Sequence, residues 1–192
     1  MKAWAKITLV SLGSIGAAVP AYADGVFETL SANCGKAFAG KAERAPEGDG
    51  WRTAKLVMHI RDCSETQIKV PLHYNDNRSR IWIISKTETG LRLKHDHRHE
   101  NGHPDTVTMY GGDSPPGDGS AGDTAVDFIV DAESIQLFKD NGNTRSVTNV
   151  WTMAVDGPRF TYGLVRPGLD FLVAFDLRKP VSAPPPAWDL VH

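Results

Sequence analysis

The chain has 192 residues, with 21 Lys and Arg, 23 Asp and Glu, and a formal net charge of −2. A chain of this length is typical of one domain with a single hydrophobic core. The basic residues are scattered rather than clustered, so the charge pattern excludes the electrostatic footprint of a nucleic-acid or anionic-membrane binder.

The N-terminus has the three parts of a secretory signal peptide. Lys2 and Lys6 precede an apolar stretch over residues 7–19, and Ala21-Tyr22-Ala23 provides an A-x-A cleavage site. The stretch is shorter than the roughly 20 residues that span a bilayer. We therefore expect a cleaved signal peptide over residues 1–23 and a periplasmic or secreted mature chain of 169 residues, with a net charge of −4 and no membrane insertion.

Cys34 and Cys63 are the two cysteines of the chain. Two cysteines in a chain exported to an oxidising compartment usually pair, and no neighbour in the sequence marks either as a reactive thiol. We expect a disulfide, which on the chain-entropy model would stabilise the fold by roughly 3–4 kcal/mol.

Most of the mature chain alternates apolar and polar residues with a period of two, which predicts β-strands. Candidate strands cover residues 54–61, 67–74, 80–86, 91–99, 106–110, 146–155, 159–166 and 169–177, with a further one within 34–42. Short turns rich in Asn, Asp and Gly join many of them, which favours antiparallel pairing. We expect a mainly β fold, an up-and-down, lipocalin-like barrel of about eight or nine strands, since closure removes the sheet edges; a two-sheet β-sandwich is the second architecture.

One short helix is predicted near residues 132–141. Asp131 suits its N-cap, Val130 and Ile135 can form a hydrophobic staple, and Gly142 suits its C-terminal end. We expect this helix to pack on the barrel.

The remaining segments set the domain boundaries. The Gly- and Pro-rich residues 111–122 predict a flexible loop, and the proline-rich residues 183–192 predict an extended tail with Trp188 as a tether. The expected organisation is one barrel domain over residues 24–182, followed by this tail.

Residues 91–103 (LRLKHDHRHENGH) hold four of the seven histidines. On a strand, alternate residues share a face, so Leu91 and Leu93 would face the core and the histidines would lie toward one mouth of the barrel. Imidazoles two residues apart can bind one metal ion, and zinc and copper both suit them. The predicted site consists of His95, His97, His99 and His103, holding zinc or copper or orienting a polar ligand. The alternative is a solvated strand end.

Other residues give weaker indications of a functional site. No G-x-S-x-G nucleophile elbow occurs, and His59 and His73 are expected to be structural. Trp51, Trp82 and Trp151 are expected in the core or in a cavity wall.

The residues Lys94-His-Asp-His-Arg-His-Glu100, followed by Val107-Thr-Met-Tyr-Gly-Gly112, resemble a pattern in an uncharacterised family of exported proteobacterial proteins. The resemblance implies export and a bacterial source, and no activity. A weaker likeness to lipocalin-type barrels rests on architecture alone, since the lipocalin G-x-W signature is missing.

The expected function is that of an exported β-barrel binding protein for a small molecule or a transition metal ion. The first alternative is an enzyme that uses His95, His97 or His99 as a general base or metal ligand. The second is a structural or interaction module of the cell envelope.

Overall fold

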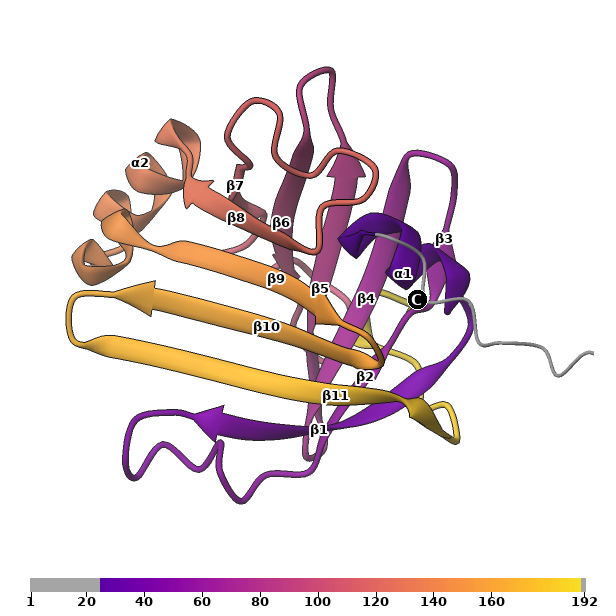
Figure 1. Ribbon diagram of the computed structural model, residues 1–192. Coiled ribbons are helices and arrows are strands. Elements are labelled where there is room, and N and C mark those ends of the chain that lie inside the picture. Colours follow the sequence, from indigo (N-terminus) through magenta and orange to yellow (C-terminus); the bar gives the residue numbers. More distant parts are fainter. Residues whose placement is uncertain (1–24, 191–192) are drawn as a thin grey trace, which may run out of the picture.

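The computed structural model describes residues 25–190, which form one antiparallel sheet closed into a barrel (Figure 1). The eleven strands are β1 (Ala37–Arg44), β2 (Leu56–His59), β3 (Asp62–Cys63), β4 (Gln67–Tyr74), β5 (Asn77–Lys86), β6 (Leu91–His97), β7 (Tyr110–Asp113), β8 (Ala125–Val130), β9 (Val150–Asp156), β10 (Arg159–Arg166) and β11 (Leu169–Val181). The helices are α1 (Val26–Ala32) and α2 (Ala132–Asp140), with 3-10 turns η1 (Thr144–Thr148) and η2 (Trp188–Leu190).

From β4 to β11, each strand pairs with the next one along the chain. β11 pairs with β1, and β1 pairs with β2. The pairing of β2 with β4 closes the ring. Because β2 and β3 pair with successive parts of β4, they share one position, and the closed barrel has ten strands. The predicted antiparallel barrel is confirmed. The predicted eight or nine strands were too few, and the alternative of a sandwich is wrong, because the sheet has no second, separate layer.

The difference in strand number comes from β8, which lies between the predicted loop, residues 111–122, and the predicted helix. Gly111 to Asp113, the first residues of the predicted loop, belong to β7. The strand β8 comes after the rest of the loop and ends just before α2. In β8, exposed and buried residues alternate along its whole length, so its period-two signal is present in the sequence. The strand predicted at residues 106–110 begins only at Tyr110, and the one predicted from residue 146 begins at Val150, after η1.

The helix α2 lies where it was predicted, and the Asp131 side chain caps it by accepting a hydrogen bond from Ser134 N. The second helix, α1, was not predicted. Its buried residues Val26, Phe27 and Leu30 join the hydrophobic core at the end of the barrel opposite α2 (Figure 1). This end is therefore filled by apolar side chains.

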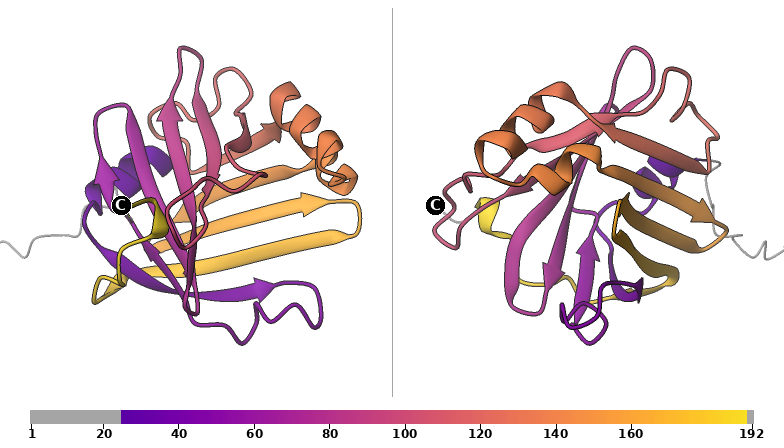
Figure 2. Two further views of the ribbon diagram at one scale, coloured as in Figure 1. Left: turned by 180° about the vertical axis from the view of Figure 1, so that it is seen from behind. Right: turned by 90° about the vertical axis from the view of Figure 1, so that its left-hand side faces the viewer.

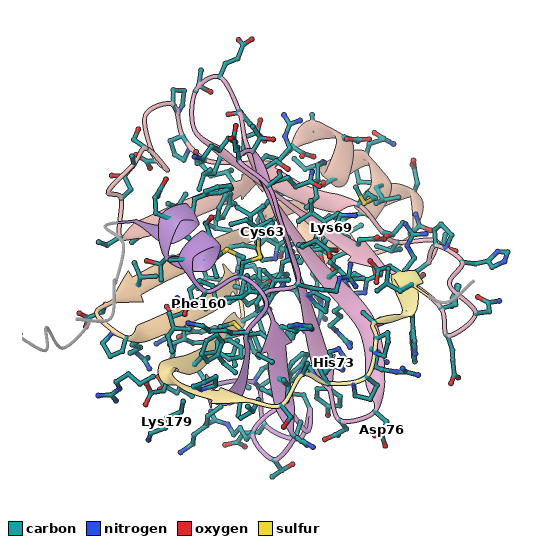
Figure 3. The ribbon with its side chains drawn as sticks, turned by 90° about the vertical axis from the view of Figure 1, so that its right-hand side faces the viewer. Cys63, Lys69, His73, Asp76, Phe160 and Lys179 are labelled. Carbon is teal, nitrogen blue, oxygen red and sulfur yellow. A yellow bond between two sulfur atoms is a disulfide. The ribbon has the colours of Figure 1, made fainter. Side chains whose placement is uncertain are left out.

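The predicted disulfide is confirmed. Cys34 follows α1 and is joined to Cys63 in β3, which lies beside α1 in Figure 3. The bond ties the helix that fills one end of the barrel to the wall strand next to it.

The C-terminal segment after β11 folds back over the outer wall of the barrel near His73 (left view of Figure 2; Figure 3). Arg78 donates a hydrogen bond to the Pro186 carbonyl, and Arg61 forms a bidentate ion pair with Asp189. The residues predicted as a tail are thus docked on the wall. His73 points outward from β4 and is nevertheless only 4% exposed, in agreement with its expected structural role.

Within residues 25–190, no helix has both the length and the apolar character that a membrane-crossing helix requires. The predicted signal peptide, residues 1–23, lies outside the part of the chain that the structure describes.

Candidate ligand cavity

The barrel contains a cavity of about 350 Å³ at the end opposite α1. The right view of Figure 2 looks toward this end, where α2 and the β10–β11 turn are found. Seven aromatic side chains contribute to its wall: Trp51, Trp82, Tyr110, Phe138, Trp151, Tyr162 and Phe171. The prediction that Trp51, Trp82 and Trp151 line a core or cavity wall is confirmed.

Strand alternation explains which side chains reach the cavity. On β10 the inward residues are Phe160, which is buried in the core, and Tyr162, Leu164 and Arg166, which line the cavity. The pairing of β5 with β6 sets Trp82 opposite His95 and Arg80 opposite His97. Three polar side chains, those of Arg80, His95 and His97, therefore lie beside Trp82 at the wall of a mainly apolar cavity.

His95 is 4% exposed and uses both ring nitrogens in hydrogen bonds. Its Nδ1 lies 3.2 Å from the carbonyl oxygen of Tyr110, and its Nε2 lies 2.7 Å from the hydroxyl of Tyr162. Because a carbonyl can only accept, Nδ1 carries the proton and Nε2 accepts from the Tyr162 hydroxyl. Burial, assisted by the nearby His97, lowers the pKa of His95 to about 3, so the ring is neutral at neutral pH.

His97 is half-buried, and its Nε2 shares a 2.9 Å hydrogen bond with the hydroxyl of Tyr110. Burial and the positive charge of Arg80 lower the pKa of His97 to about 4. Burial also raises the pKa of Tyr110 to about 12 and that of Tyr162 above its usual range. At neutral pH these two histidine–tyrosine pairs are uncharged.

The backbone of β7 brings Tyr110 into position. At Gly111 an added Cβ would collide with the Leu93 carbonyl, and at Gly112 with the Ile129 carbonyl, so the strand can lie this close to both neighbours only with glycine. Ser134 in α2 also accepts a hydrogen bond from Gly111 N. The Tyr-Gly-Gly sequence therefore has a packing explanation.

Two arginines complete the polar part of the cavity. Arg80 donates to Asn77 Oδ1 at 3.0 Å, and its guanidinium lies over the rings of Trp51 and Tyr74, 5.5 and 5.9 Å from their centroids. Arg166 donates to Ser146 Oγ at 3.0 Å and to Asn149 Oδ1 at 3.1 Å. Both charges act on the Tyr110 hydroxyl and oppose the rise of its pKa.

The four histidines of the predicted site are only partly brought together. His95 and His97 line the cavity, whereas β6 ends at His97, and the side chains of His99 and His103 are exposed in the turn that follows. The backbone of that turn is closed by a hydrogen bond from His99 N to the His103 carbonyl. Within residues 25–190, no three His, Cys, Asp or Glu side chains are grouped so that they could hold a metal ion.

Sequence reasoning missed the polar groups contributed by other strands. Arg80 has the same parity on β5 as the buried Trp82 and Ile84, and Arg166 has the same parity on β10 as Tyr162 and Leu164. An arginine on the inward face of a predicted strand is unusual, and this position could have indicated that both arginines belong to the site. The partners of the histidines, Tyr110 and Tyr162, lie 13 and 67 residues from them along the chain, so their pairing required the barrel register.

Comparisons with known proteins add no family or neighbour. No protein-family model matches the chain, and searches of curated proteins and of solved structures found no match. The resemblance to exported proteobacterial proteins stays a prediction.

Proposed function

We propose that the protein is an exported binding protein that holds one small, mainly apolar organic molecule in the barrel cavity. The observation that carries the proposal is the cavity itself, about 350 Å³ in volume, with aromatic walls and a few convergent polar groups. Its size and lining are those of small-molecule sites in general. The confirmed disulfide is compatible with an oxidising compartment outside the cytosol.

Hydrogen bonding favours binding over catalysis as the role of His95. Both of its ring nitrogens are engaged with Tyr110 and Tyr162, which fixes the ring in the wall and leaves no nitrogen for a substrate proton. His97 keeps Nδ1 as a group that can hydrogen-bond a ligand. Of the two histidines that line the cavity, only His97 is therefore left for the enzyme alternative.

The metal alternative has a direct test. Metal binding to the folded state raises the melting temperature in proportion to the logarithm of metal concentration above the dissociation constant. A rise with micromolar zinc or copper that is lost in His97→Ala, and kept in His73→Asn, would support a metal site. Because Nε2 of both cavity histidines is already hydrogen-bonded, we expect no rise.

The proposed function is tested with N-phenyl-1-naphthylamine, a neutral apolar probe that fluoresces when it leaves water. We expect saturable binding of one probe molecule per chain to the full protein. Leu164→Trp should abolish this binding, because Leu164 lies on the cavity wall and a larger side chain would fill the space.

The matched control is Val165→Trp, one residue further along β10. Val165 points outward and is 43% exposed, so this variant adds the same side chain outside the barrel and should bind the probe as the native protein does. Equal binding by both variants, or no saturable binding by the native protein, would contradict the proposed function.

A further inference from the structure

The two cavity arginines differ from most others in their partners. Six arginines form ion pairs with carboxylates: Arg44, Arg61, Arg92, Arg98, Arg159 and Arg178. Among the residues 25–190, Arg80 and Arg166 form no such pair, and their side-chain partners are the neutral groups of Asn77, Ser146 and Asn149. Each therefore brings an uncompensated positive charge to the cavity wall.

The remaining N–H groups of these two cavity-lining arginines have no hydrogen-bond partner in the described chain. The protein hydrogen bonds of both side chains use Nη1 only. Within the described chain, the one fully buried side-chain nitrogen or oxygen without a partner is Trp188 Nε1, so Nε and Nη2 of Arg80 and Arg166 are not sealed within protein. An arginine presents these donors as a planar fork that matches a carboxylate.

One carboxylate does lie at the cavity, that of Asp49, and it does not neutralise either arginine. Its Oδ1 accepts a hydrogen bond from the backbone N of Trp51, which closes the turn before that residue. A positive charge in an apolar space is stabilised by an anion brought in by a ligand.

Aromatic rings make up much of the cavity wall that these arginines share. Trp82 stacks on Tyr162 with ring centroids 4.2 Å apart, and Trp51 meets Phe171 edge to face at 4.9 Å. Rings of this kind make offset or edge contacts with a further aromatic ring. Arg80 is already held over Trp51, which orients its fork at the edge of this aromatic space.

We propose that the ligand of this cavity is a small aromatic carboxylate, with its acid group bound by the Arg80 guanidinium, with Arg166 near by, and its ring packed among Trp51, Trp82 and Trp151. This inference rests on the proposed function and gives it a ligand class. The anion supplies the partner that both arginines lack within the protein, and the ring fills the apolar volume.

The test compares 2-naphthoate with 2-naphthamide, which has nearly the same shape and no charge, by calorimetric titration of the full protein. We expect 2-naphthoate to bind about 10- to 100-fold more tightly, as for a charge-assisted hydrogen-bonded pair. Arg80→Gln should remove most of this preference while 2-naphthamide binding changes little, and Arg80→Lys should retain part of it.

Arg92→Gln is the matched control, because it removes the same charge from the outer face of β6, where Arg92 pairs with Asp113. It should keep the full preference. If both compounds bind equally to the native protein, or if the preference survives in both Arg80→Gln and Arg166→Gln, the assigned ligand class is wrong and the cavity remains a binding site. If neither compound nor the neutral naphthylamine probe binds, the proposed function itself fails.

Discussion

The Tyr162 hydroxyl is the hydrogen-bond partner that a buried imidazole needs, since it donates to Nε2 of His95 at 2.7 Å. Tyr162→Phe would leave this nitrogen unsatisfied inside the barrel. We predict a loss of about 1–3 kcal/mol in the free energy of unfolding, measured by urea denaturation. Tyr74→Phe removes a hydroxyl whose contact with the Asp49 carbonyl is 3.5 Å long and exposed, and should cost clearly less. Equal losses in the two variants would contradict the role given to Tyr162.

The buried histidines make stability depend on pH. Burial lowers the pKa of His95 to about 3, and those of His73 and His97 to about 4, whereas in the unfolded chain they titrate near 6.5. Their stabilising contribution is therefore complete above about pH 6.5 and is lost as the pH falls toward the folded values, because the unfolded chain takes up protons first.

We predict that the free energy of unfolding falls between pH 6.5 and pH 5 by up to about 1.4 kcal/mol per pH unit for each buried histidine. His97→Gln removes one of the groups that take up a proton on unfolding, so it should reduce this slope by the contribution of one histidine. His103→Asn, which alters an exposed histidine, should leave it unchanged. Denaturation curves that coincide at pH 7 and pH 5 would contradict the burial of these rings.

At the scale of elements, the disulfide and α1 together close the end of the barrel that lies away from the cavity. Cys34 and Cys63 are 29 residues apart in the sequence, and the bond constrains this loop in the unfolded chain. We predict that the Cys34→Ser/Cys63→Ser double variant loses roughly 3–4 kcal/mol in urea denaturation. An unchanged midpoint after reduction of the native protein would show that the bond contributes nothing to stability.

The docked C-terminal segment depends on the ion pair between Arg61 and Asp189, whose side chains are 11% and 10% exposed. Asp189→Asn would leave Arg61 with Asp62 as its nearest acid. We predict a loss of about 1.5–3 kcal/mol and faster proteolysis of the last ten residues, followed by mass spectrometry. Unchanged stability and unchanged cleavage would mean that the segment is held by other contacts.

The elements that could be predicted from the sequence are those with a local signal. Alternation gave β4, β5, β6, β10 and β11 to within a few residues, and capping residues gave α2. β8 was not predicted, although buried and exposed residues alternate along it. α1 was missed because its seven residues are too few for a helical period to stand out.

At the scale of the whole molecule, the strand with the histidines was predicted correctly, but the side chains from other strands that share the cavity with them were not. Alternation placed His95 and His97 on the inward face of β6. β6 ends at His97 and the chain turns over residues 99–103, which leaves His99 exposed outside the cavity. Asn101-Gly102 marks this turn in the sequence, but it does not mark the last residue of the strand before it. The two arginines reach the cavity from β5 and β10, and only closure of the barrel brings these strands around one space.

The central claim is that a small aromatic acid occupies the barrel cavity, and the tryptophan indole N–H signals in a two-dimensional ¹⁵N NMR spectrum test it most directly. Trp51, Trp82 and Trp151 line the cavity, whereas Trp188 lies in the segment docked on the outer wall. On titration with 2-naphthoate we predict that the three cavity signals shift together and saturate at one ligand per chain while the Trp188 signal stays in place. Unchanged cavity signals, or a shift of Trp188 alone, would contradict the claim.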